Sequence, residues 1–342
     1  MSRYKDIFDA VRDPQTFSSH LKSLNIPSHD IPDEPPITYD PPEHGSYREI
    51  VNPFFTPAKI AEFEQWIRET AKRYTDRLLQ WDSFDVVKDL AAHVTKDVVL
   101  HVIGIVDPPV DLRKWVDDLA LNTGNPLAAQ RFLEFVSAEI EKRRGSPSDD
   151  IIGALLKAKL GDHRSLTQGE IVNMLVLLMV AGMDTTTSAI GGSVWYLVQN
   201  PDAQKKLLAA DEGVWRLALD EFVRWVSPVA GLARTVRNDT EFHGCPMHAG
   251  DRVFLLWGSG NRDETEFPDP DKVILDRFPN RHMGFGMGLH RCLGSHLAKA
   301  TLQAVLKVLL KDLSNFRLTG LDDIVWEAAE VRGIKSLPLV RK

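Results

Sequence analysis

The stretch FGMGLHRCLG, Phe285 to Gly294, decides how this sequence is interpreted. Three of its residues are glycines, which let a backbone turn tightly and approach a flat partner closely. A helical pattern, Ser295 to Leu310, begins just after Cys292. Backbone N–H groups and the positive dipole end of a helix near a sulfur favour its thiolate form. The stretch therefore predicts a metal-ligating thiolate in a glycine-built cradle, although a lone cysteine is more often a small buried hydrophobe.

The composition is that of a globular chain. Of the 342 residues, 43% are hydrophobic and 26% are charged, and the formal net charge of −7 argues against a nucleic-acid partner. Two cysteines, Cys245 and Cys292, provide no disulfide framework, which is consistent with a reducing cytoplasm. The start lacks the apolar core of a signal peptide, and the longest apolar run, Met174 to Gly182, is too short to cross a bilayer. We therefore expect a cytoplasmic protein without membrane insertion.

The first part of the chain is rich in proline, with nine of the twenty prolines in the first 57 residues. Since proline blocks helix continuation, we expect one short helix near Tyr4 to Arg12, followed by a long loop from Ser18 to Pro42. Three basic or titratable residues of this loop, His20, Lys22 and His29, could anchor a charged ligand.

Helical periodicity dominates the next stretch, from residue 58 to about residue 145. The expected helices are Ala58 to Leu79, Leu90 to Val106, Asp111 to Leu121 and Pro126 to Arg144, with a turn at Asn122 to Asn125.

The longest expected helix begins at a capping box, Thr167 to Glu170, and runs without proline to Asn200. Its middle, Ala181 to Ser188, contains a glycine, a carboxylate and several hydroxyl residues, which are poor choices for a helix centre. Two interpretations remain open: a polar kink satisfied by backbone hydrogen bonds, or a proton path above a reactive centre.

Two charged pairs lie at helical spacing. His44 and Arg48 follow Pro42 and share one helix face, and Glu221 and Arg224 lie near a helix end at Ser227-Pro228. Exposed pairs of this kind are usually surface features.

After this helix, the sequence pattern changes to one typical of short strands and turns. We expect strands at Val229 to Thr235, Asp239 to His243 and Arg252 to Leu256, a proline-rich meander from Phe267 to Arg281, and short strands from Phe316 to Leu339. Cys245 falls in the turn after Gly244 and has no glycine cradle, so we assign it no role.

These stretches together resemble the cytochrome P450 family. In its haem-binding loop, Phe, Gly and a basic residue precede the ligand cysteine and Gly follows it; the matching residues are Phe285, Gly286, His290, Cys292 and Gly294. The segment DPPEH before Arg48, the motif AGMDTT and the Glu-x-x-Arg pair also match, in the family's order, from about Asp13 to Leu339.

The resemblance implies a site built on haem b, iron protoporphyrin IX, with Cys292 as the iron ligand. The implied cofactor-binding residues are His44, Arg48, Ala181, Arg234, Phe285, His290, Cys292 and Gly294. Four of them are cations suited to the two haem propionates, because partly buried carboxylates need cationic partners.

The resemblance also assigns roles to the polar helix centre and to the Glu-x-x-Arg pair. Asp184 and Thr185 would be the catalytic acid–alcohol pair that relays protons to dioxygen, for which Ala181 and Gly182 leave room. A structural cluster would combine three residues: Glu221, Arg224 and Arg277.

The fold and activity that follow are those of a soluble bacterial-type cytochrome P450. We expect a single, mainly α-helical domain over residues 1–342 with small sheets, and a haem-thiolate monooxygenase that hydroxylates, epoxidises or O-dealkylates a substrate with O2. A chain of this length leaves no room for a flavin or iron–sulfur module, so electrons would come from a ferredoxin and its reductase.

Three alternatives stay open on the sequence. They are a peroxygenase that uses hydrogen peroxide, a non-oxidative haem-thiolate isomerase or dehydratase, and a zinc-binding protein with His290, Cys292 and His296 as ligands. The acid–alcohol pair argues against the first, and the lack of a paired C-x-x-C argues against the last.

Two departures from the family concern the N-terminus and the lid. The chain starts near where the second helix of the family begins, and the lid region from Pro109 to Arg143 is short. The expected substrate-pocket residues are all apolar and predict a small hydrophobic substrate, such as a terpenoid or an aromatic: Leu177, Val180, Ala181, Val229, Leu232 and Val331.

Overall fold

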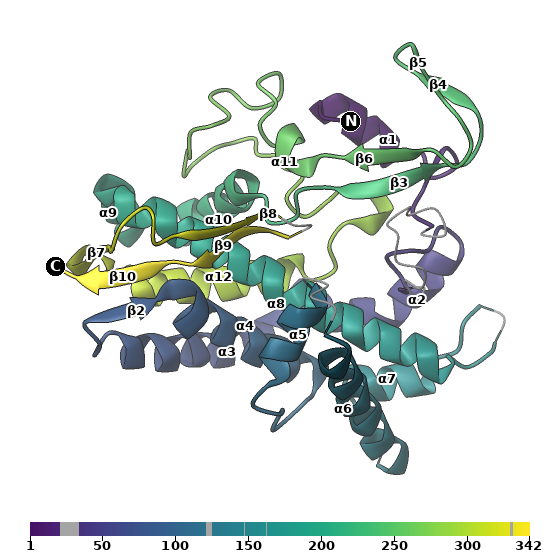
Figure 1. Cartoon of the computed structure of the whole chain (residues 1–342), viewed down its shortest axis with the longest axis horizontal. Coiled ribbons are helices and arrows are strands. Elements are labelled where there is room, and N and C mark those ends of the chain that lie inside the picture. Colours follow the sequence, from purple (N-terminus) through teal and green to yellow (C-terminus); the bar gives the residue numbers. More distant parts are fainter. Residues whose placement is uncertain (21–33, 121–124, 147, 162, 329–330) are drawn as a thin grey trace.

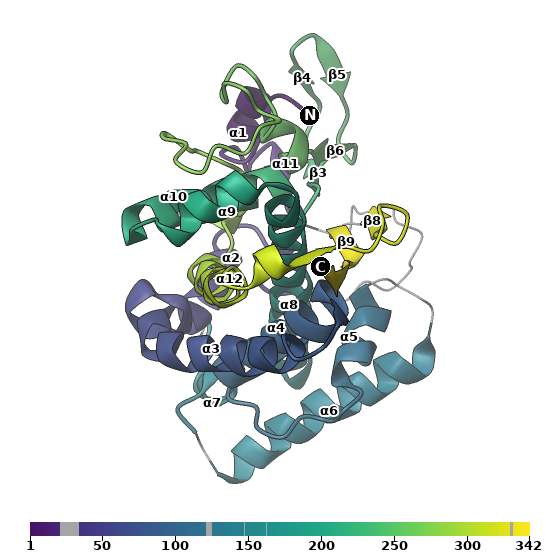
Figure 2. The same cartoon turned by 90° about the vertical axis from the view of Figure 1, so that its left-hand side faces the viewer.

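The computed structural model describes residues 1–20, 34–120, 125–146, 148–161, 163–328 and 331–342. This described part is mainly helical, and its longest helix, α8 (Gln168–Gln199), runs through the middle of the molecule (Figure 1; Figure 2). The predicted capping box is confirmed, because Thr167 and Glu170 each bond the other's backbone N–H. The polar centre does not interrupt the helix, so its hydroxyl groups are accommodated within one continuous element.

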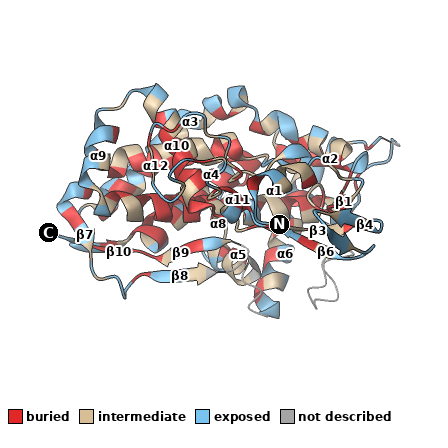
Figure 3. Cartoon of the chain, turned by 90° about the horizontal axis from the view of Figure 1, so that it is seen from above, coloured by how far each residue is buried: buried red, intermediate tan, exposed pale blue. Residues whose placement is uncertain are grey.

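A bundle of helices surrounds α8 and supplies most of the core. Its members are α3 (Pro57–Leu78), α4 (Ala92–Ile103), α10 (Glu212–Val226) and α12 (Ser295–Leu309). The side chains of these helices that face one another are buried, whereas α3 presents a polar face to solvent (Figure 3). The apolar stripe predicted from Ala58 to Leu79 therefore faces the core, as its spacing indicated.

One predicted helix differs from the structure at both ends. The segment predicted from Leu90 to Val106 starts with a π-helical turn at Val86–Ala91 and ends at Ile103. It ends there because Gly104 adopts the left-handed conformation, with φ of +93°, which terminates a helix.

The remaining helices lie around this bundle. They are α1 (Tyr4–Ala10), α2 (Glu43–Val51), α5 (Leu112–Ala120), α6 (Pro126–Gly145), α7 (Ile151–Lys157), α9 (Pro201–Leu208) and α11 (Trp257–Gly260). The sequence predicted the bounds of α1, α5 and α6 to within a few residues, and for α2 it predicted only a helix that follows Pro42.

The strands form small antiparallel sheets. In one sheet β1 (Phe17–Ser18) pairs with β3 (Leu232–Val236), and β3 pairs with β6 (Arg252–Leu255). The hairpin of β4 (Thr240–Phe242) and β5 (Cys245–Met247) projects beyond this sheet (Figure 1). The prediction that Cys245 lies in a turn was wrong. The two residues before it have positive φ and complete the turn, so Cys245 begins a strand.

A second three-stranded sheet contains β2 (Ser83–Asp85), β10 (Pro338–Arg341) and β7 (Phe316–Leu318), in that order. Two further strands, β8 (Val325–Ala328) and β9 (Arg332–Ser336), form a hairpin.

The β8–β9 hairpin is fixed to the centre of α8. Ser188 Oγ donates a hydrogen bond of 2.7 Å to the carbonyl oxygen of Arg332. A Cβ atom on Gly333 would lie only 2.1 Å from the same Ser188 oxygen, so the close approach requires glycine at this position. The hairpin is therefore held in a defined place above the polar part of the helix.

Some expectations lie outside the described residues. The structure does not describe most of the loop expected from Ser18 to Pro42, including Lys22 and His29. It also does not describe most of the turn expected at Asn122 to Asn125.

One helix of the described chain, α8, has the length and composition of a membrane span. However, 61% of its most apolar window is buried inside the protein, as in the core helix of a soluble protein.

Candidate active site

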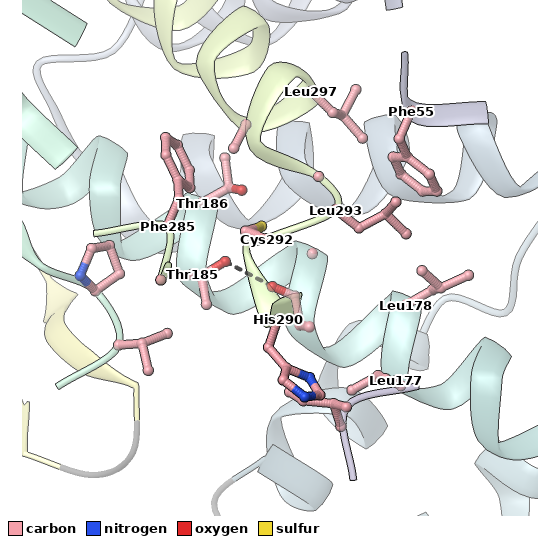
Figure 4. Close-up of a pocket in the computed structure, with 18 of the residues that line it drawn as sticks. Phe55, Leu177, Leu178, Thr185, Thr186, Phe285, His290, Cys292, Leu293 and Leu297 are labelled. Atoms are coloured by element: carbon pink, nitrogen blue, oxygen red, sulfur yellow. Dashed lines mark hydrogen bonds between the residues drawn. The ribbon is translucent and has the colours of Figure 1, made fainter. Parts of the chain in front are cut away.

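One cavity brings most of the predicted site residues together. It lies between α8, the loop before α12, α2 and the start of β3 (Figure 4). The predicted residues that line it are His44, Arg48, Leu177, Ala181, Thr185, Val229, Leu232, Arg234, Phe285, His290, Cys292 and Gly294.

Three predicted residues do not line this cavity: Val180, Asp184 and Val331. The cavity side of α8 follows helical spacing through Leu177, Ala181 and Thr185, so the residues just before Ala181 and Thr185 lie off that side. Val331 forms an isolated backbone bridge with Val229, and Val229 is the member of this pair that reaches the cavity.

The loop around Cys292 is held by its own backbone. The N–H of Cys292 donates to the carbonyl of Phe285 over 2.8 Å, which closes the loop. Gly286 and Gly288 have φ of +65° and +67°, a region that side chains disfavour. At Gly288 a Cβ atom would also lie 2.7 Å from the carbonyl oxygen of Val11. These two glycines are thus required by the fold of the loop itself.

The thiol of Cys292 experiences opposing influences. Burial is the largest and raises its pKa, while the N–H of Gly294 and the charges of Arg291 and Arg48 act to lower it. The backbone N–H at the helix start thus acts in the predicted direction, but desolvation of the charged sulfur outweighs it and the pKa of the free thiol is raised. The side chain nevertheless has accessible surface, since it faces the open cavity. A bound metal cation would reverse the balance, because a coordinating thiol is deprotonated.

Four cationic or titratable side chains line the cavity close enough to influence one another's charge: His44, Arg48, Arg234 and His290. The rings of the two histidines are 4.3 Å apart between centroids. Burial, together with the charge of Arg234, lowers the pKa of His290 to about 3. The nearby carboxylate of Asp40 is already bonded elsewhere, by two serines and another arginine.

This group of side chains fits a bound anion. Arg234 is 8% exposed and forms no ion pair with any described residue, and burial lowers the pKa of its guanidinium to about 10. The Nε2 atom of His44 is buried and has no hydrogen-bond partner among the described residues. A buried cation without an ion pair and a buried polar atom without a partner are both costly, so the two observations together indicate an anionic partner.

The surroundings of Cys292 also fit a flat, closely approaching group. Gly294 lines the cavity and has ordinary backbone angles, and a Cβ atom there would meet no protein atom within 4 Å. Glycine at this position is thus not required by the packing of the chain. Haem, with two carboxylates and an iron ion, satisfies both the cation group and the cysteine, and the residues present fit it.

The polar centre of α8 lies in the same cavity wall. Thr185 Oγ1 donates a hydrogen bond of 2.7 Å to the carbonyl of Ala181, drawn as the dashed line in Figure 4. Its oxygen can still accept a hydrogen bond from a water or a substrate. The glycine at 182 has a packing role, because a Cβ atom there would lie 2.9 Å from the side chain of Val99 on α4.

Asp184 has partners that sequence reasoning missed. Its side chain is 2% exposed, and Arg113 of α5 donates to Oδ1. The other oxygen, Oδ2, lies 3.6 Å from Nζ of Lys335 on β9. Both cations are distant in sequence and belong to no motif, so only the folded chain reveals them.

The Glu221, Arg224 and Arg277 residues form a buried cluster, as the resemblance implied. Both guanidinium groups donate to the carboxylate of Glu221, over 2.8 Å from Arg224 and 3.0 to 3.1 Å from Arg277. The two guanidinium groups also donate to backbone carbonyls of the meander, including those of Pro268 and Pro270, and Arg224 donates to that of Asn261 before it. The cluster thereby fixes the meander that leads into the Cys292 loop.

Comparison with known proteins gives consistent results. The family model described as Cytochrome P450 matches residues 126–212 and 214–324. A steroid C26-monooxygenase of Mycolicibacterium smegmatis is 32% identical over 98% of this chain and 86% of its own length. Cytochrome P450-terp of Pseudomonas sp is 35% identical over 88% of this chain and 74% of its own length. The crystal structure of HmtN, a hydroxylase of himastatin biosynthesis, superposes with a TM-score of 0.90 at 30% identity, covering 100% of this chain and 90% of that one.

Proposed function

This chain belongs to the cytochrome P450 family, and on that premise we propose that Cys292 holds the iron of haem b in the cavity described above. The protein is a haem-dependent monooxygenase, an oxidoreductase that uses O2 and electrons from a redox partner. The observation that carries the proposal is the joint presence, in one cavity, of Cys292 and of the largely buried Arg234, which forms no ion pair with a carboxylate in the part of the chain that the structure describes.

The chain's own groups hold the cofactor in this proposal. Arg234, His44 and His290 would hold the two carboxylates of haem b, and Cys292 would supply the sulfur ligand to its iron. When bound, the haem supplies the oxidising chemistry, which the protein's thiolate ligand tunes toward O–O cleavage. As a ligand of the haem iron, the sulfur of Cys292 would be deprotonated, although desolvation otherwise raises its pKa.

Proton supply falls to Thr185 and Asp184 in this proposal. The hydroxyl of Thr185 faces the cavity and accepts a hydrogen bond from a water molecule there, while its own O–H donates to the Ala181 carbonyl. Asp184, one residue earlier and buried, passes protons toward this water.

The substrate is proposed to be a small hydrophobic molecule. Leu177, Leu232 and Val229 line the cavity beside the helix, and its walls are largely apolar. The names of the similar proteins mention a steroid and a methyl-branched lipid, which are also apolar. A cavity of this kind gains affinity mainly from apolar burial.

Three further expectations complete the proposal. The electron donor is a ferredoxin served by a ferredoxin reductase, as the resemblance to soluble bacterial members of the family implies. The working location is the cytoplasm, because the few thiols form no disulfide. Residues 1–342 form one domain, with the Glu221 cluster connecting its helical and irregular parts.

The test uses isotope-labelled dioxygen with reduced ferredoxin, ferredoxin reductase and a panel of terpenes, steroids and aromatic acids. We expect one labelled oxygen atom in the product. Product without label would instead identify an isomerase or dehydratase.

A second measurement separates the monooxygenase from a peroxygenase. With oxygen and reduced ferredoxin, the Thr185→Ala variant should form less product per electron pair consumed than the wild type, by roughly tenfold or more. Activity with peroxide alone, unchanged in Thr185→Ala and absent with ferredoxin, would refute the assigned proton role.

A further inference from the structure

Ser188 differs from two other buried hydroxyl residues of α8 in where its hydrogen bond goes. Thr187 and Ser193 each donate to the backbone carbonyl four residues earlier in their own helix. Such a bond satisfies a hydroxyl group inside a helix without help from another element. Ser188 instead donates over 2.7 Å to the carbonyl of Arg332 on β9. Its hydroxyl group therefore connects α8 to the β8–β9 hairpin, which runs alongside this helix (Figure 1).

Gly333 allows the hairpin to come this close to α8. A Cβ atom at this position would lie 2.1 Å from Oγ of Ser188 and 2.9 Å from its Cβ, so rotating the hydroxyl group away would not make room. The backbone of Gly333 does not itself require glycine, since its φ lies outside the left-handed region. A glycine inside a strand weakens the strand and often marks a close approach of another group. The Ser188–Gly333 contact thus sets the distance between β9 and α8.

The backbone of Arg332 connects this contact to the wall of the cavity. Its N–H donates over 2.8 Å to the carbonyl of Pro228, while its carbonyl accepts the bond from Ser188. The neighbouring residues Val331 and Val229 form an isolated backbone bridge. Pro228 and Val229 line the cavity, as does one side of α8. Two walls of the cavity are therefore joined through the backbone of a single residue.

We propose that Ser188 and Gly333 fix the distance between these two walls, and thereby the bulk of the substrate that the cavity admits, an inference that rests on the proposed monooxygenase function. Neither residue lines the cavity, so both are positioning residues that act through Pro228 and Val229. The contact cannot be widened without moving these two residues, because both are bonded to the same stretch of β9. A displacement of about 1 Å is enough to change how a substrate meets the reacting atoms.

The test measures how the haem-loaded protein binds two imidazole probes, whose ring nitrogen is a ligand for iron. One probe is unsubstituted imidazole, and the other carries a bulky triphenylmethyl group. Absorbance titration gives a dissociation constant for each probe, and the ratio of the two reports the room beside the iron. The variants are Gly333→Ala, Ser188→Ala and the control Ser193→Ala, which removes a buried hydroxyl group of α8 that bonds its own helix.

Gly333→Ala should raise the relative affinity for the bulky probe by about tenfold, because the added methyl group pushes β9 and the attached wall away from α8. Ser188→Ala should change the ratio in the same direction by a smaller factor, since it removes the hydrogen bond but adds no bulk. Ser193→Ala should give the wild-type ratio. An unchanged or lowered ratio in Gly333→Ala, or an equal rise in Ser193→Ala, would overturn the inference. If Gly333→Ala does not fold, the ratio in Ser188→Ala decides, and a wild-type value there overturns the inference.

The double variant of Ser188→Gly with Gly333→Ala separates positioning from a general loss of stability. The new Cβ atom would lie 3.5 Å from the Cα atom of residue 188, which is an ordinary contact distance. The probe ratio should therefore return toward the wild-type value, even though glycine inside a helix lowers the urea midpoint of unfolding. A ratio that stays at the value of Gly333→Ala would contradict the inference.

This binding test is distinct from the test of the proposed function. A raised probe ratio in Gly333→Ala, together with a wild type that forms no labelled product, would remove the monooxygenase assignment and leave the role of Ser188 and Gly333 in place. Labelled product together with a wild-type ratio in every variant would remove only the role of these two residues.

Discussion

Arg234 shows how one buried side chain determines what the cavity can bind. Its guanidinium lies on β3, almost inaccessible to solvent, and its only hydrogen bond to a described residue is to the neighbouring carbonyl of Ala233. Burial disfavours its charge and lowers its pKa to about 10. An anion in the cavity would relieve this cost.

Replacing this arginine is therefore expected to weaken cofactor binding. In Arg234→Gln the affinity for haem should fall by about tenfold to a hundredfold, which corresponds to about 1.5–3 kcal/mol for a charged hydrogen bond. Titration of the apoprotein with haem measures it. The matched control is Arg252→Gln, on the adjacent strand and away from the cavity, which should bind haem normally. Equal affinities of the two variants would contradict the propionate assignment.

For single residues, the sequence predicted which side chains belong to the site but not which residues they contact. Cys292, Arg234 and His44 could be identified because their motifs are local and their residue types are chemically restricted. The contacts of Asp184 with Arg113 and Lys335 could not, since no spacing rule joins residues so far apart in the chain.

Among the elements, α8 depends on its N-terminal cap. Glu170 accepts hydrogen bonds from the Thr167 backbone, from Arg164 and from Tyr47 of α2, so it connects α8 to α2. These bonds, first that from Arg164, lower the pKa of Glu170 from 4.5 to about 2.

The lowered pKa of Glu170 gives a pH dependence with a defined sign. The unfolded chain takes up the proton near pH 4.5 and the folded chain only near pH 2, so the stabilisation is complete above pH 4.5 and is lost as the pH falls toward 2. Urea unfolding should show wild type more stable than Glu170→Gln by about 1–3 kcal/mol at pH 7, a difference typical of charged hydrogen bonds. The difference should shrink between pH 4.5 and pH 2. A difference independent of pH in that window would contradict this account.

Long, strongly patterned elements were predictable, while the ends of others were not. The capping residues and the absence of proline set the limits of α8 from the sequence alone. The end of α4 depends on the left-handed conformation of Gly104. The position of Cys245 in a strand depends on the turn that precedes it. The approach of β9 to α8 rests on a contact between Gly333 and Ser188 that no local pattern contains.

For the whole molecule, the Glu221 cluster joins the helices to the irregular meander. Glu221 and Arg224 are completely buried, and Arg277 nearly so. Besides the two arginines, the backbone N–H of Ile274 also donates to the carboxylate. Loss of this carboxylate would leave two buried cations without a counter-charge.

Glu221→Gln is accordingly expected to destabilise the entire protein by about 3–5 kcal/mol, the cost of breaking a buried ion pair from one side. Denaturant unfolding measures this, and the expected single transition would support one domain over residues 1–342. Glu212→Gln on the same helix is the control. Its carboxylate is 77% exposed, and surface pairs contribute at most about 1 kcal/mol. A small effect at Glu221, equal to that at Glu212, would show that the cluster does not hold the fold together.

The central claim, that Cys292 ligates haem iron as a thiolate, is tested most directly by the absorption spectrum of the reduced protein under carbon monoxide. The wild type and Cys245→Ser should both show the red-shifted band that thiolate-bound ferrous haem gives, because Cys245 is exposed on a distant hairpin. Cys292→Ser should lose this band even where it retains haem. A red-shifted band that survives in Cys292→Ser, or that is absent from the haem-loaded wild type, would contradict the claim.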